Sequence, residues 1–140
     1  MSEQILTKEQ IQEKLAKSSF TNFLDIEVLE ADVEKQELRA RVQLRPEFER
    51  GFETGQWHGG VLAALIDTVG DYGLAMLVGR PLPTINFRVD YLRPAIKTAL
   101  TVVAKVRRAG KSIGVVDIEV LNDQGALVAI GRANYSTLPG

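Results

Sequence analysis

Two-residue alternation of apolar and polar positions marks six stretches of the chain, and a helical period marks two others. The clearest alternation runs from Leu38 to Leu44, where apolar residues are separated by Arg39, Arg41 and Gln43. Such a pattern is typical of a strand with one buried face. We predict the other five strands from similar patterns, over residues 20–33, 84–91, 100–106, 113–121 and 127–135.

The first helical period follows a capping signal near the N-terminus. Thr7 can cap a helix there, and Gln10 stands three residues later, as a capping box requires. Ile11 and Leu15 mark the edge that this helix would bury. We expect residues 1–19 to form a helical brace against the rest of the domain.

The longest helical pattern, GQWHGGVLAALIDTVGDYGLAM, runs from Gly55 to Met76, and no proline interrupts it. Asp67 lies off its apolar face, among helical neighbours that are small or acidic. A carboxylate in a groove of small side chains can be approached by a ligand or by another backbone. At the helix start, Gly59 and Gly60 leave uncrowded N–H groups at the positive end of the helix dipole, which suits a developing oxyanion.

The order of these elements is helix, two strands, one long helix and four strands. This order predicts an α+β fold in which a mostly antiparallel six-stranded sheet wraps one central helix. At 140 residues, 45% of them hydrophobic, the chain is long enough to bury its own core. We therefore expect one domain over residues 1–140.

Composition narrows the function. Seventeen basic and eighteen acidic residues leave a net charge of -1, which does not favour a nucleic-acid or membrane-surface binder. The chain has no Cys and one His, so thiol catalysis and a Cys or His metal cluster are excluded, and we expect no metal. The N-terminus lacks a signal-peptide pattern, and Asp67 and Asp71 interrupt the long apolar run, so we expect a cytoplasmic protein.

Four short motifs together resemble one family. They are His58-Gly59-Gly60, Asp67 nine positions after the His, Tyr91-Leu92-Arg93-Pro94-Ala95, and Gly110-Lys111-Ser112. They look like those of the hotdog-fold acyl-CoA thioesterases of the phenylacetate-degradation and 4-hydroxybenzoyl-CoA type, and the likeness runs from about Leu44 to Ser136. The resemblance implies hydrolysis of an aryl or medium-chain acyl-CoA, with no cofactor besides the coenzyme A of the substrate.

The resemblance also implies roles for single residues. Gly59 would donate its backbone N–H to the thioester carbonyl beside Gly60, and Asp67 would act as nucleophile or as general base. Thr84 matches a position that helps to place the hydrolytic water, although its strand face could equally be solvated. His58 would take part in proton transfer or simply cap the helix.

Two further parts of the chain bear on substrate binding. The turn near which relatives hold coenzyme A matches a basic segment, which could also be an ordinary solvated hairpin: Arg107, Arg108, Gly110, Lys111 and Ser112. Many relatives carry Asn or Gln six residues before the His to orient the carbonyl, whereas this chain has Phe52 there. Gln56 could substitute, or a shifted loop could present Glu53.

Spacing along the central helix predicts an oligomer. Gly59 and Asp67 are eight residues apart, which is about 12 Å on one helix. A reacting carbonyl needs both groups within about 3 Å of its own atoms or of the attacking water. Two antiparallel copies of the helix would satisfy this requirement across a two-fold axis. We expect a homodimer with active sites at the subunit interface, assembled further into a homotetramer.

Two other functions stay open at this stage. Hotdog proteins include dehydratases that use a His with a carboxylate, although this chain lacks their His-Phe-Pro-Gly type of loop. A non-catalytic acyl-CoA binder is the other reading, and Phe52 in place of the usual amide is its best argument. For two further residues we expect ordinary structural roles: Asp71 solvated or at an interface, and Trp57 in packing.

Overall fold

The computed structural model describes residues 5–139. The predictions for residues 1–4 of the N-terminal brace and for residue 140 lie outside the described residues. The helices are α1 (Lys8–Lys17), α2 (Ser19–Leu24), the 3-10 turn η1 (Pro46–Phe48) and α3 (Gly59–Val78). The strands are β1 (Glu27–Asp32), β2 (Glu37–Val42), β3 (Thr84–Tyr91), β4 (Leu100–Ala109), β5 (Ile113–Leu121) and β6 (Leu127–Ser136).

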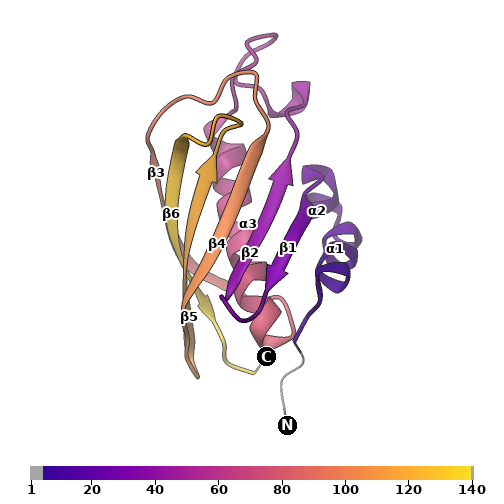
Figure 1. The fold of residues 1–140 in the computed structure, drawn as a ribbon, viewed down its shortest axis with the longest axis vertical. Helices are drawn as coiled ribbons and strands as arrows, with labels where there is room; N and C mark the ends of the chain where they lie inside the picture. The colour runs from indigo at the N-terminus through magenta and orange to yellow at the C-terminus, as the bar shows by residue number, and fades with distance from the viewer. Residues whose placement is uncertain (1–4, 140) are drawn as a thin grey trace.

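The six strands form one sheet in the order β1-β2-β4-β5-β6-β3, and every neighbouring pair is antiparallel. The long helix α3 lies against one face of this sheet and contacts five of its strands (Figure 1). This arrangement confirms the predicted hotdog fold, with one helix wrapped by an antiparallel sheet.

Helix α3 follows a His cap and ends at Val78, where Gly79 in the left-handed conformation (φ 97°) caps the last turn. Its core face is apolar, with Leu65, Ile66 and Leu74 fully buried. Small residues bring the sheet close: a Cβ on Gly73 would lie 2.9 Å from the Cβ of Ala104. Because these contacts are tight, α3 has little freedom to shift against the sheet.

By length and composition alone, α3 is apolar enough to cross a membrane. The sequence suggested that Asp67 and Asp71 exclude this, and that interpretation was wrong. Most of the same stretch is nevertheless buried inside the fold. A core helix passes the same test of length and composition, so the burial against the sheet accounts for the apolar composition of α3.

Strand β3 lies at the end of the sheet and, among the described strands, pairs only with β6. The alternation along β3 predicted that its apolar residues face the core. Phe87 and Tyr91 do alternate with polar residues along this strand. At this edge, however, Phe87 stays 39% exposed and Tyr91 53%, and the neighbouring Ile85 is 51% exposed. One chain therefore leaves an apolar strip uncovered along an unpaired strand edge.

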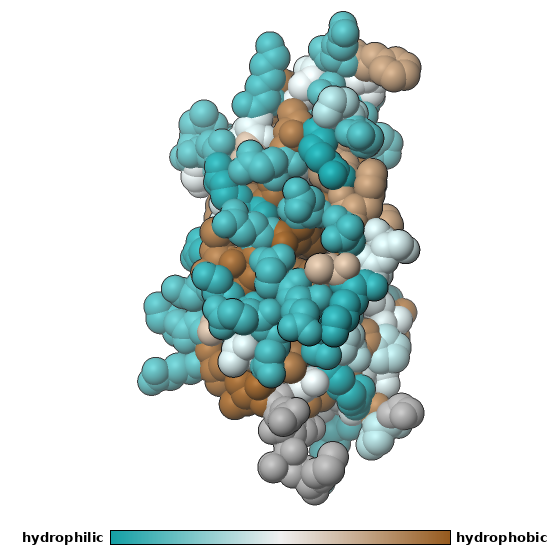
Figure 2. Space-filling view, turned by 90° about the vertical axis from the view of Figure 1, so that its right-hand side faces the viewer, coloured by the Kyte–Doolittle hydropathy of each residue, from teal (hydrophilic) through white to brown (hydrophobic). Residues whose placement is uncertain are grey.

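At the N-terminus the prediction was partly right. The first helix is present, and Thr7 and Gln10 form the predicted capping box. The predicted strand over residues 20–33 was wrong at its start, where α2 forms instead. Asp25, in the left-handed conformation (φ 54°), ends α2, and the strand β1 follows. Seen from the side of α1 and α2, hydrophilic residues cover most of the surface (Figure 2).

Candidate active site

The start of α3 carries one backbone donor that the protein leaves free. His58 is the N-cap, and its Nδ1 accepts a hydrogen bond from the N–H of Gly60 at 2.8 Å. The N–H groups of Trp57, His58 and Val61 all donate to backbone carbonyls. Among residues 57–61, only the N–H of Gly59 has no acceptor in the described part of the chain. It lies at the positive end of the helix dipole.

Tyr91 of β3 fixes the peptide that follows this donor. Its hydroxyl donates to the carbonyl oxygen of Gly59 at 2.5 Å. A Cβ on Gly59 would lie 3.4 Å from the Tyr91 ring, so the two residues are in close contact. Beside them is a cavity of about 380 Å³, and its lining includes Gln56 and Leu62.

Gln56 and Glu53, the two candidates for orienting the thioester carbonyl, lie in different environments in the loop before α3. Phe52 is fully exposed at the loop tip, and Glu53 is also exposed, with a left-handed backbone (φ 60°). Gln56 instead is half-buried and lines the same cavity as Gly59. Trp57 is buried, stacks on Phe48 and donates its indole N–H to a backbone carbonyl, which confirms its predicted packing role.

At the middle of α3, Asp67 is half-buried and faces the start of β3. Its Oδ1 accepts a hydrogen bond from the hydroxyl of Thr84 at 2.7 Å. The backbone carbonyl of Asp67 accepts a second bond from the hydroxyl of Tyr135, also at 2.7 Å. Burial, and then the charges of Asp67 and Asp71, raise the pKa of Tyr135 far above its usual range, so this phenol stays protonated and donates.

Asp71, one turn after Asp67, is not solvated, which was one of the two environments that the sequence suggested, the other being an interface. Its Oδ1 accepts the backbone N–H of Leu82 at 2.8 Å, and its side chain is largely buried. Burial raises the pKa of Asp71 to about 7; the negative charge of Asp67 adds to this, and the Leu82 hydrogen bond opposes it. The site therefore contains two carboxyl groups in different environments on one helix face.

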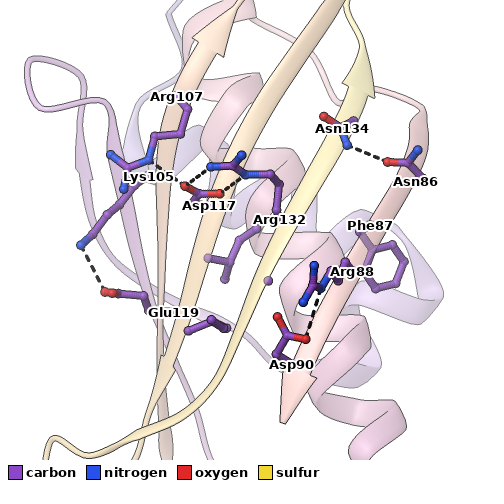
Figure 3. Close-up of a pocket in the computed structure, with 13 residues that line it drawn as sticks. Asn86, Phe87, Arg88, Asp90, Lys105, Arg107, Asp117, Glu119, Arg132 and Asn134 are labelled. Atoms are coloured by element: carbon purple, nitrogen blue, oxygen red, sulfur yellow. Dashed lines mark hydrogen bonds and ion pairs between the residues drawn. The ribbon is translucent and has the colours of Figure 1, made fainter. Parts of the chain in front are cut away.

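The basic segment lies apart from these residues within one chain. Arg107 donates to Asp117 at 2.9 Å on the outer face of the sheet, where Arg132 binds the same carboxylate (Figure 3). Hydrogen bonds from Arg132 and then Arg107 lower the pKa of Asp117. This face has a hollow of about 600 Å³ whose lining includes neither Gly59 nor Asp67. Arg107 is thus engaged in an ion pair.

The turn between β4 and β5 carries the rest of that segment. Arg108, Lys111 and Ser112 are exposed, and the backbone of Gly110 closes the turn by donating to Ile113. No hydrogen bond links these residues to the Asp67 site in the described part of the chain. Within residues 5–139, no cluster of three His, Cys, Asp or Glu side chains could hold a metal ion.

Comparison with known proteins decides the family. The model of the thioesterase superfamily matches residues 54–129, which include both the start of α3 and Asp67. The chain belongs to the thioesterase superfamily. The prediction of a thioester hydrolase is thereby confirmed, and the PaaI relatives described next confirm the predicted resemblance to the phenylacetate-degradation type.

Individual members of this superfamily support the assignment. The acyl-coenzyme A thioesterase PaaI of Escherichia coli is 37% identical over 89 residues, or 59% of each chain. Its solved structure superposes with a TM-score of 0.81, covering 94% of this chain and 93% of that one. Another solved thioesterase-superfamily protein is 36% identical, with a TM-score of 0.85, and covers 91% of this chain and 96% of its own.

The raised pKa of Asp71 predicts how stability depends on pH. Between about pH 4 and pH 7 the folded chain keeps a proton on Asp71 that the unfolded chain loses, so the contribution of Asp71 to the free energy of unfolding falls as pH rises, by about 1.4 kcal/mol per unit. Asp71→Asn does not titrate and keeps an oxygen acceptor for Leu82. We expect this variant to be about 2–4 kcal/mol more stable than the wild type at pH 8, and nearly equal to it at pH 4.

Urea unfolding from pH 4 to pH 8 measures the difference between the two proteins. Glu30→Gln, at an exposed position of β1, controls for the change in net charge. A stability difference between Asp71→Asn and the wild type that stays constant over this range would contradict the assigned environment of Asp71.

Proposed function

We propose that this thioesterase hydrolyses an acyl-CoA, with an aryl or medium-chain acyl group, to the free acid and coenzyme A. The observation that carries the proposal is the N–H of Gly59, which has no acceptor within residues 5–139 while its neighbours are all bonded. Support for the acyl-CoA class comes from relatives: PaaI is named as an acyl-coenzyme A thioesterase, and YigI of E. coli, 29% identical over 102 residues, as a medium/long-chain acyl-CoA thioesterase.

The proposed site requires two chains. Gly59 and Asp67 lie eight residues apart on α3, which corresponds to about 12 Å, too far for one thioester carbonyl and its attacking water. A second copy would bring its Asp67 to the Gly59 of the first. The uncovered apolar strip of β3, formed by Ile85, Phe87 and Tyr91, offers the surface on which the second copy would pack.

We propose a homodimer with two equivalent sites at its interface, and a homotetramer built from two such dimers. We further propose that residues 1–140 act as one domain in the cytoplasm, with the N-terminal helix as its brace. Gln12 of α1 supports the brace, because its side chain bonds both the carbonyl of Ile26 and the N–H of Val28 at 2.8 Å.

In the proposed reaction the thioester carbonyl oxygen accepts the N–H of Gly59, and Gln56 lies where it can orient the same carbonyl. Asp67 of the other chain, held by Thr84, either removes a proton from water as the water oxygen attacks the carbonyl carbon, or attacks that carbon itself. The negative charge that develops on the carbonyl oxygen is stabilised by Gly59 and by the helix dipole. The C–S bond then breaks, and coenzyme A leaves as the thiolate. Where Asp67 is the base, it returns its proton to this thiolate. Where Asp67 is the nucleophile, the acyl group stays on its carboxylate as an anhydride, and water then hydrolyses the anhydride to the free acid and the Asp67 carboxylate, with the proton taken up by the thiolate. No metal or further cofactor is part of the proposal.

His58 and Gly60 have supporting roles in this proposal. His58 caps α3 through Nδ1 and takes the N–H of Gly60, which leaves the N–H of Gly59 as the donor at the substrate. A dehydratase would need His58 for proton transfer, so the cap does not favour that alternative. For the phosphates of coenzyme A we propose the exposed turn with Arg108, Gly110, Lys111 and Ser112, with Arg107 already paired to Asp117.

Thiol release from a panel of aryl, short-chain, medium-chain and long-chain acyl-CoA thioesters tests the function. We expect the wild type to hydrolyse aryl or medium-chain members, and Asp67→Asn to lower kcat by about 10³-fold or more, because the amide can neither accept a proton nor attack. Retained binding of acyl-CoA by Asp67→Asn would show that only chemistry is lost. An absence of turnover on every thioester, with measurable acyl-CoA binding, would instead establish a non-catalytic binder.

The donor at Gly59 can be removed without removing the helix. Proline is well tolerated at the first helical position, where Gly59 stands, and the extended backbone of His58 (φ −71°, ψ 133°) suits a residue before proline. We expect Gly59→Pro to lower kcat by about 10²-fold to 10³-fold, the usual cost of losing one oxyanion donor. Gly59→Ala adds a Cβ but keeps the N–H, so it should retain at least about tenfold more activity than Gly59→Pro. Equal losses in both variants would assign the effect to crowding against Tyr91.

A further inference from the structure

Asp71 and Asp67 hold two neighbouring points of the same extended segment. Asp67 accepts the hydroxyl of Thr84 at 2.7 Å, and Asp71 accepts the N–H of Leu82 at 2.8 Å. Four residues along a helix span about 6 Å, and two residues along an extended chain span about 6.6 Å. The two hydrogen bonds are therefore matched in spacing and join α3 to the start of β3 at two adjacent points.

The sequence of the connection makes the Asp71 bond specific. Leu82 stands between Pro81 and Pro83, and proline has no N–H, so the Leu82 N–H is the one backbone donor of residues 81–83. Leu82 is buried, with 4% of its surface exposed. Without Asp71 this buried donor would lose its partner, and the segment that leads to Thr84 would lose its attachment to α3.

A third contact fixes the other side of Thr84. Tyr135 lies opposite Thr84 in the register of β3 and β6, and its hydroxyl binds the backbone carbonyl of Asp67. Gly70 makes this contact possible, because a Cβ there would lie 2.5 Å from the Tyr135 hydroxyl oxygen. The Asp67–Thr84 pair is thus held from β6 by Tyr135 and from the α3–β3 connection by Asp71.

We propose that Asp71 is a positioning residue of the thioesterase site, which attaches the Leu82 segment to α3 so that the Thr84 hydroxyl stays on the Asp67 carboxylate. The role rests on the proposed function, because it acts through Thr84 and Asp67 and not on the substrate. A carboxyl group at this buried position is costly to ionise, and Asn offers the same acceptor oxygen without that cost. The hydrogen bond, and not the charge, is the feature that serves positioning.

The test is a double-mutant cycle between Asp71 and Thr84, with kcat and KM normalised to folded protein. We expect Asp71→Ala to lower kcat by about tenfold to a hundredfold with little change in KM, and Asp71→Asn to recover most of this loss. In a Thr84→Val background, where the hydroxyl is already absent, Asp71→Ala should lower kcat by less than about twofold. A general loss of stability would lower kcat equally in both backgrounds and would overturn the proposal.

Hydrogen exchange gives a readout that does not depend on turnover. The Leu82 amide of the wild type and of Asp71→Asn should be protected, and in Asp71→Ala it should exchange faster than neighbouring amides of β3. Unchanged protection in Asp71→Ala would overturn the positioning role even if the enzyme is active. A wild type that hydrolyses no thioester would overturn the proposed function and this role with it, whereas an active wild type without coupling would overturn this role alone.

Discussion

The rigidity of one long helix constrains every other part of this structure. Helix α3 separates a free N–H at its first residue, Gly59, from a carboxylate at its middle, Asp67, by about 12 Å, and tight packing against the sheet prevents the helix from bending to shorten this distance. Within one chain, Gly59 and Asp67 are therefore too far apart to act on the same thioester carbonyl. The proposed dimer is therefore a consequence of helix geometry, and the uncovered strip on β3 is the surface that such a dimer would use.

The same packing explains how a helix that is mostly core can present polar groups accurately. Glycines on α3 let the sheet approach closely, so that side chains from β3 and β6 reach its backbone and its acids. Thr84 and Tyr135 bind Asp67, and Asp71 binds the connection between α3 and β3. At the helix start, His58 and Tyr91 both hold the peptide between Gly59 and Gly60, which directly follows the Gly59 donor. Each polar group of the site is thus oriented by a neighbour from another element.

Periodicity predicted much of this fold because most strands have one face on α3 and the other in solvent. In β2, for example, Leu38 and Ala40 are buried while Arg39 is exposed. The error at residues 20–24 arose because a short run with Phe20, Phe23 and Leu24 fits either period. The signal that ends α2 is a backbone angle at Asp25, which the residue pattern does not indicate.

The site was less predictable where it depends on backbone partners. The His-Gly-Gly motif indicated a donor at the helix start, but the engagement of Gly60 by His58, which leaves the Gly59 N–H free, follows only from the side-chain geometry. The environment of Asp71 could not be predicted, because its partner is the backbone N–H of Leu82. Residue types do not indicate which backbone N–H groups bind a side chain. The exposure of Phe87 was also hidden, since alternation does not reveal that a strand lies at the edge of the sheet.

Complementation between two inactive variants tests the central claim that each site combines Gly59 of one chain with Asp67 of another. Gly59→Pro and Asp67→Asn are co-expressed with different tags, and mixed dimers are compared with each variant alone. Shared sites predict that each mixed dimer has one site with both changes and one intact site, so a random mixture recovers roughly one quarter of wild-type activity. If mixed dimers form and stay as inactive as the separate variants, each chain supplies its whole site and the account is contradicted.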